Sequence, residues 1–97
     1  MKIALDWDDT CTRDLPFWKH FVETCKRSKV DVRIVTMRYP REIDDDMRSF
    51  DIQIYCTSRR FKREYMNNKP WQPDIWIDDT PDFIVGKLWM VDKEVCE

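Results

Sequence analysis

Short apolar runs recur along this chain, and most of them stop at polar residues. The runs are rich in valine, isoleucine and aromatic residues, and each is shorter than an ordinary helix. We therefore expect them to form buried strands. The expected strands cover residues 2–6, 31–35, 52–55, 74–77 and 87–91.

Between these runs, apolar residues repeat at the three- and four-residue spacing of amphipathic helices. Pro16 and Pro40 suit the first turns of two helices, and Thr57 or Ser58 suits the cap of a third. Alternating strands and helices are typical of an α/β fold with a parallel, doubly wound sheet, which binds ligands at the carboxyl ends of its strands. The expected apolar helix residues are Phe17, Phe21, Val22 and Cys25, then Ile43, Met47 and Phe50, then Phe61 and Tyr65.

Composition favours a single globular domain over residues 1–97. The chain is 42% hydrophobic, which argues against disorder, and its net charge of -2 gives no general signature of nucleic-acid binding. No apolar run approaches the ~20 residues of a membrane helix, so no membrane partner is expected. Four cysteines without CxxC spacing and one histidine disfavour a zinc site. Because the chain opens into a strand rather than a signal peptide, we expect reduced thiols and a cytoplasmic protein.

The segment Asp6-Trp7-Asp8-Asp9-Thr10 follows the first expected strand and carries the main chemical signal. A carboxylate such as Asp6 can attack phosphorus and form an aspartyl-phosphate. Asp8 points the same way and can protonate the leaving oxygen, then accept a proton from water. Thr10 is expected to hold the turn by bonding to nearby backbone. The alternative interpretation is a solvated turn, because aspartate favours turns.

A second acidic pair, Asp78-Asp79, follows the fourth expected strand. If the two strands are neighbours, these carboxylates approach Asp6, and their repulsion requires a cation or a shared proton. Hard oxygen ligands suit Mg²⁺, so we expect a magnesium site formed by Asp6, Asp78, Asp79 and the backbone carbonyl of Asp8. The alternative for Asp78-Asp79 is a helix cap before Pro81.

Single polar residues could complete a phosphate site. Thr36 ends the second expected strand, where its hydroxyl could bond a phosphoryl oxygen. Lys62 is the first candidate for the balancing cation, and Lys69 is the second. Three arginines, Arg13, Arg38 and Arg41, lie in loops at the same edge, and one of them is a candidate for bidentate binding of substrate phosphate, Arg38 and Arg13 first. The alternative for each is a solvated surface charge.

These elements, in this order, resemble the haloacid dehalogenase (HAD) superfamily over about residues 2–91. The resemblance rests on the D-x-D-x-T segment beginning at Asp6, on Thr36, on Lys62 or Lys69, and on Asp78-Asp79. It implies a Rossmann-like, three-layer fold with strand order 5-4-1-2-3. It also implies Asp6 as nucleophile, Asp8 as acid and base, and Mg²⁺ as cofactor. Asp8, where dehalogenating relatives carry alanine, implies phosphoryl transfer.

The chain departs from many members of this family because neither expected insertion point has room for a cap domain. Residues 9–15 and 56–60 are too short to hold one. By resemblance, a capless site implies a large substrate or closure by a second copy in a homo-oligomer. We expect an Mg²⁺-dependent phosphomonoesterase, a hydrolase, with a nucleotide or a nucleic-acid end as its first candidate substrates. The alternative is a non-catalytic metal-binding domain that binds a partner or regulates it.

Overall fold

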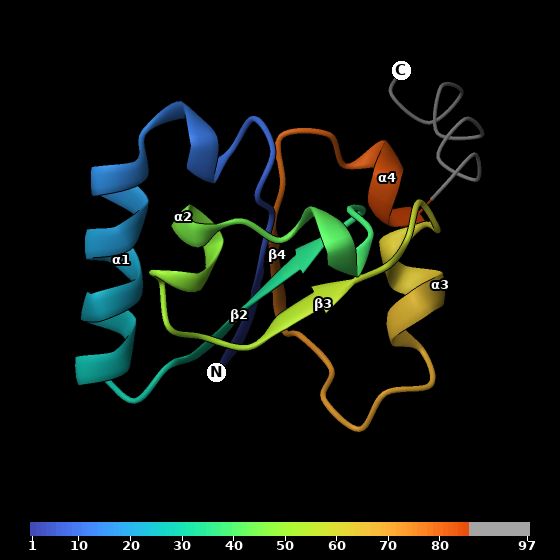
Figure 1. Ribbon diagram of the computed structural model, residues 1–97. Coiled ribbons are helices and arrows are strands. Elements are labelled where there is room, and N and C mark those ends of the chain that lie inside the picture. Colours follow the sequence, from blue (N-terminus) through green and yellow to red (C-terminus); the bar gives the residue numbers. More distant parts are fainter. Residues whose placement is uncertain (86–97) are drawn as a thin grey trace, which may run out of the picture.

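The structure, a computed structural model, describes residues 1–85. Its elements alternate between strand and helix, as expected (Figure 1). They are β1 (Lys2–Leu5), the short 3₁₀ helix η1 (Cys11–Arg13), α1 (Leu15–Arg27), β2 (Asp31–Thr36), η2 (Pro40–Glu42), α2 (Asp45–Arg48), β3 (Ile54–Cys56), α3 (Lys62–Met66), β4 (Ile75–Ile77) and α4 (Asp82–Val85).

The strands form one parallel sheet in the order β3-β2-β1-β4. Read from the β4 edge the order is 4-1-2-3, so the described sheet differs from the predicted 5-4-1-2-3 in having four strands. The predicted strand at 87–91 lies outside the described residues. β1 is central, with Ile3 in register with Val32 on one side and Ile75 on the other.

Helices cover both faces of the sheet, which gives three layers (Figure 1). Alternate residues of each strand enter different cores, because strand side chains point to opposite faces in turn. Ile3, Leu5 and Ile34 pack toward α1 and α2, whereas Ala4 and Val35 pack toward α3. The α/β prediction is therefore confirmed, and the carboxyl ends of all four strands meet at one edge.

Helix α1 begins where Asp14 Oδ1 accepts a hydrogen bond from the Phe17 amide. Val22 and Cys25 are buried as expected, but Phe17 is 57% exposed, so its assignment to the core was wrong. Trp18, which packs against the core, lies at the i, i+4, i+7 spacing with Val22 and Cys25. Phe17 is one position, or about 100°, away from that stripe.

The single helix expected from Pro40 is also wrong, because the chain extends at Ile43 and Asp44 between η2 and α2. Asp44 causes the break: its side chain accepts a hydrogen bond from the Met47 amide and starts α2 anew. Met47 and Phe50 are nevertheless fully buried.

Neither Thr57 nor Ser58 caps α3, which begins only at Lys62. The Thr57 hydroxyl donates instead to the Arg60 carbonyl oxygen at 2.7 Å, and Ser58 and Arg59 adopt left-handed conformations with φ of 55° and 72°. Among residues 1–85 the cysteines Cys11, Cys25 and Cys56 are free thiols. No helix in this part of the chain is long and apolar enough to cross a membrane.

Candidate active site

A buried lysine joins the two acidic segments. Asp6 follows β1, where its amide donates to the Ile77 carbonyl oxygen and extends the β1–β4 pairing. Lys62, from the first turn of α3, places Nζ 2.7 Å from Asp6 Oδ1 and 2.6 Å from Asp78 Oδ2. Lys62 is 2% exposed and Asp6 is 7% exposed, so these ion pairs are shielded from water. The structure therefore places Lys62, and not Lys69, against the acidic segments.

Thr10 connects Asp6 to the second acid of the later pair. Its hydroxyl lies 2.9 Å from Asp6 Oδ2, to which it donates, and 3.4 Å from Asp79 Oδ1. The expectation that Thr10 binds nearby backbone was wrong, because the side chain is buried among carboxylates that need a donor. Asp78 Oδ1 accepts from the Thr80 amide, which closes a local turn before Pro81, while its other oxygen binds Lys62. Because α4 begins only at Asp82, Asp78 does not cap that helix.

Asp6, Asp78 and Asp79 form an acidic triad, which offers three carboxylate oxygens within 4.8 Å of one another. Lys62 supplies one positive charge for three potential negative charges. Burial raises the pKa of Asp6 to about 6, although the nearby Lys62 ammonium opposes this rise. A hydrogen bond with Asp6 lowers the pKa of Asp79. The triad is therefore short of positive charge, and its hard oxygen donors fit Mg²⁺.

Asp8 lies outside this triad and faces Arg38. Arg38 Nη2 donates to Asp8 Oδ1 at 2.8 Å, and Nε donates to Asp8 Oδ2 at 3.1 Å. Arg38 Nη1 also donates to the Glu42 carbonyl oxygen and to Asp44 Oδ2. These bonds, with that to Asp8 foremost, raise the pKa of Arg38 above its ordinary value. Arg38 is therefore fixed as a clamp on the carboxylate predicted to act as acid and base.

Thr36 occupies the predicted position at the end of β2, next to β1. It is 1% exposed, and its Oγ1 accepts a hydrogen bond from the Arg38 amide at 3.3 Å. The hydroxyl proton is thus left for another acceptor. The same bond holds Arg38 in position in the loop after β2.

A hollow of about 310 Å³ opens beside the triad. Arg13 lines it, and Arg13 Nε donates to the Asp9 carbonyl oxygen at 3.0 Å. Trp18 also lines it, a residue that sequence reasoning missed although its helical spacing with Val22 marks it as inward-facing. The full lining is Asp9, Thr10, Arg13, Trp18, Ile77, Asp78 and Asp79.

The buried thiol of Cys11 is not a competing nucleophile. Burial, together with the charge of Asp6, raises the pKa of Cys11 to about 12. A thiol with that pKa stays protonated near neutral pH, whereas the thiolate is the reactive form. Cys11 is therefore an unreactive thiol beside Asp6.

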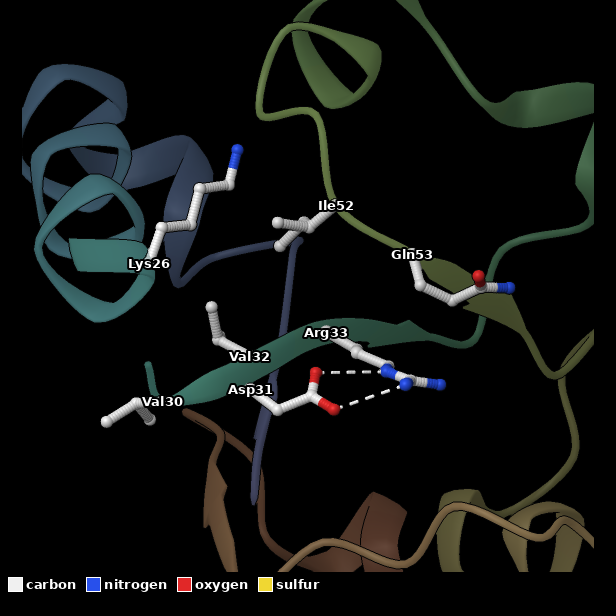
Figure 2. A pocket seen from close by; sticks show the side chains of 7 residues that line it. All are labelled: Lys26, Val30, Asp31, Val32, Arg33, Ile52 and Gln53. Atoms are coloured by element: carbon white, nitrogen blue, oxygen red, sulfur yellow. Dashed lines mark hydrogen bonds and ion pairs between the residues drawn. The ribbon is translucent and has the colours of Figure 1, made fainter. Parts of the chain in front are cut away.

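A second hollow lies at the opposite edge of the sheet, where β2 begins (Figure 2). Its charged groups are already paired, since both Asp31 carboxylate oxygens accept hydrogen bonds from Arg33. Arg33 also donates to the Tyr55 hydroxyl, and Trp71 Nε1 donates to Asp31. The bonds from Arg33 and Trp71 lower the pKa of Asp31, and the bond from Arg33 to Tyr55 joins β2 to β3. These polar groups therefore serve the fold.

Searches against protein-family models, curated proteins and solved structures give no match for this chain. The interpretation of the site therefore rests on its residues and their geometry.

Proposed function

We propose that this protein is an Mg²⁺-dependent phosphomonoesterase of the HAD type, with Asp6 as its nucleophile. The observation that carries the proposal is the convergence of Asp6, Lys62, Asp78 and Asp79 at the carboxyl ends of β1 and β4. Lone acidic turns do not bring a buried lysine between two carboxylates, and a lysine there can also bind a phosphoryl oxygen. The five-strand order 5-4-1-2-3 and the cytoplasmic location belong to the same proposal.

The reaction has two balanced steps. Asp8, once released from Arg38, first takes up a proton from water. An Asp6 carboxylate oxygen attacks phosphorus, the bond from phosphorus to the leaving oxygen breaks, and Asp8 gives that oxygen its proton. Asp8 then takes a proton from water, whose oxygen attacks phosphorus, breaks the acyl-phosphate bond and restores Asp6. Lys62 keeps Asp6 oriented, and Thr36 donates to a phosphoryl oxygen. Mg²⁺, held by the acidic triad, would neutralise charge on the phosphoryl group.

Arg38 makes the role of Asp8 depend on substrate. While both oxygens of Asp8 accept bonds from Arg38, the carboxylate is not free to work on the leaving oxygen. A phosphate dianion is a strong acceptor for a guanidinium and competes with Asp8 for Arg38. We propose that substrate phosphate loosens the clamp and frees Asp8, which agrees with the predicted role of Arg38 in binding substrate. Arg13, at the hollow beside the triad, is the second phosphate contact.

The same clamp favours one alternative function. A domain that keeps Asp8 bound to Arg38 permanently would hold metal without turnover and would act by binding or regulating a partner. Open access to the site fits a large substrate or closure by a second copy, because no cap domain interrupts residues 1–85. A screen with Mg²⁺ over sugar phosphates, nucleotides and terminally phosphorylated oligonucleotides separates the two functions. Turnover that requires Mg²⁺ supports the enzyme, and its absence across the screen supports the binding domain.

Asp8→Asn is expected to lower the rate of the chemical step by roughly 10²–10⁴-fold, because asparagine cannot exchange a proton. The affinity for Mg²⁺ should change little, since the side chain of Asp8 is not part of the triad. Single-turnover rates at saturating Mg²⁺ measure the first effect, and thermal shift against Mg²⁺ measures the second. A large loss of Mg²⁺ affinity with a normal rate at saturation would show that Asp8 is a metal ligand instead.

Mg²⁺ should stabilise the protein more at pH 7.5 than at pH 5. Because the folded-state pKa of Asp6 is raised to about 6, the metal-free protein loses stability as pH rises from about 4 to about 6. Mg²⁺ binds the ionised form and offsets this loss of stability, so ~10 mM Mg²⁺ should raise the Tm in a saturable way. The shift in Tm is measured for the parent, for Asp78→Ala and for the exposed control Asp82→Ala. Equal shifts in the parent and in Asp78→Ala would contradict a metal site at the triad.

A further inference from the structure

Charge divides the carboxyl edge of the sheet into two halves. The ends of β1 and β4 carry the acidic triad, whereas the loops after β2 and β3 carry arginines. Arg38, Arg41 and Arg59 belong to these two loops, and Arg38 stands at the boundary because it binds Asp8. A substrate with one phosphate over the triad could therefore extend its remainder toward these arginines.

Two of these arginines, Arg41 and Arg59, lie over one aromatic ring. The guanidinium carbon of Arg41 lies 4.5 Å from the centre of the Tyr39 ring, and that of Arg59 lies 5.0 Å from it. Arg59 Nη1 also donates to the Met37 carbonyl oxygen at 2.8 Å. Both arginines are thereby held at a fixed place, which lowers the entropy cost of binding an anion.

Backbone contacts join the two loops into one unit. The Arg59 amide donates to the Met37 carbonyl oxygen, and the Ser58 amide donates to the Arg38 carbonyl oxygen. Ser58 and Arg59 adopt left-handed backbone conformations to make this approach, which non-glycine residues rarely do. The unfavourable conformations place Arg59 over Tyr39.

One of these arginines makes no ion pair with the residues that the structure describes. Arg38 is paired with Asp8 and Asp44, and Arg59 is paired with Glu42 at 3.1 Å. Within residues 1–85, no carboxylate lies in salt-bridge range of Arg41. Arg41 is thus an exposed guanidinium, positioned over Tyr39, that makes no ion pair in the described part of the chain.

We propose that Arg41, supported by Arg59 and Tyr39, binds a second phosphate group of the substrate, on the leaving-group side of the phosphate that is cleaved. This inference rests on the proposed function, because the roles of Asp6 and Asp8 decide on which side of the cleaved phosphate the leaving group lies. Asp8 must reach the leaving oxygen, and the Arg38 clamp places Asp8 beside the loop that carries Arg41. The leaving group therefore departs toward this loop, where its own phosphate meets Arg41.

Helix α3 does not provide this contact, although its sequence is also basic. Lys62 is buried against the triad, and Arg60 lies near Glu64 and over the Tyr65 ring. Arg63 lines a separate hollow between α3 and α4. Arg63 is exposed and belongs to this other hollow, so Arg63→Gln is a matched control for Arg41→Gln.

The test compares kcat/KM for three substrates: a nucleoside monophosphate, a nucleoside 3′,5′-bisphosphate and a terminally phosphorylated dinucleotide. Arg41→Gln should lower kcat/KM about tenfold for substrates with a second phosphate, the loss expected for one charge-assisted contact, and should leave the monophosphate unchanged. Arg63→Gln should change none of them. If Arg41→Gln lowers kcat/KM for both the bisphosphate and the dinucleotide, a small bisphosphorylated molecule is enough to use the Arg41 site. If it lowers kcat/KM for the dinucleotide alone, the substrate is a nucleic-acid end.

Binding separates failure of this inference from failure of the proposed function. Fluorescence anisotropy of a labelled, phosphorylated dinucleotide is measured without turnover on parent, Arg41→Gln, Tyr39→Leu and Arg63→Gln proteins, each checked for its Tm. Weaker binding by the first two variants supports the inference even if no phosphomonoester is hydrolysed. Hydrolysis with equal kcat/KM and equal affinity in Arg41→Gln and parent overturns the inference while the proposed function stands.

Discussion

Asp6→Asn is expected to abolish phosphomonoesterase turnover while the protein stays folded. The amide has nearly the same shape as the carboxylate, but it is not a competent nucleophile and is a poor ligand for Mg²⁺. Lys62 Nζ still finds an oxygen acceptor at the position of Oδ1. Retained activity above roughly 1% of the parent rate would contradict the aspartyl-phosphate mechanism.

The same variant should be more stable than the parent in the absence of metal at pH 8. The pKa of about 6 means that ionising buried Asp6 costs the folded state on the order of 1–3 kcal/mol relative to the unfolded chain. Asparagine does not titrate, so its advantage should grow as pH rises from about 4 to about 6 and should vanish below this range. Urea unfolding at several pH values measures the difference.

Asp9→Asn is the matched control for this experiment. Asp9 is an exposed acid in the same loop, and its left-handed conformation, with φ of 65°, is one that asparagine tolerates well. It should change neither turnover nor the pH dependence of stability. Equal stabilisation by Asp9→Asn and Asp6→Asn would show that general charge, and not the buried cluster, sets the effect.

Lys62→Met should destabilise the protein by about 3–5 kcal/mol at pH 8, because it leaves two shielded carboxylates without their cation. That is a large part of the 5–15 kcal/mol typical of a whole domain. The loss should be smaller at pH 5, where Asp6 becomes protonated. Lys69→Met is the control, since Lys69 Nζ lies over the Tyr65 ring, 4.6 Å from its centre, and makes no ion pair within residues 1–85.

The double variant Asp6→Asn/Lys62→Met keeps this prediction testable if Lys62→Met alone does not fold. Because Lys62 no longer offsets the charge of Asp6, Asp6→Asn should stabilise Lys62→Met more than it stabilises the parent, so the two substitutions should be non-additive. An equal gain from Asp6→Asn in both backgrounds would mean that the contact between Lys62 and Asp6 carries no net energy.

Local pattern was sufficient for most of the fold. Valine and isoleucine mark β1, β2 and β4 to within one residue, because buried parallel strands leave few polar positions. The third strand was misplaced: it covers Ile54–Cys56 rather than 52–55. Asp51 adopts a left-handed conformation, with φ of 55°, and the chain pairs with β2 only after this turn. That turn has no strong local signal, since no glycine marks it.

The site was predictable as far as strand ends determine it. The placement of Asp6, Thr36 and Asp78-Asp79 follows from parallel strands that end at one edge. The choice between Lys62 and Lys69 could not follow from pattern, because it depends on α3 beginning after the left-handed turn at Ser58 and Arg59. The clamp on Asp8 also escaped prediction, since Arg38 is held by Asp44, a residue that the sequence indicates only as part of a helix.

The central position of β1 means that the two halves of the site come from distant parts of the chain. Thr10 and Asp79 share a hydrogen-bonding contact although 69 residues separate them. Closing the loop between Thr10 and Asp79 costs conformational entropy, and local contacts do not offset that cost. We therefore expect β4 to dock late in folding. In the proposed function, a nascent chain that has not yet released Asp78 and Asp79 from the ribosome would hold only half of the metal site. An Mg²⁺ ion bound across β1 and β4 would therefore fasten this long loop and stabilise β4 once it has docked.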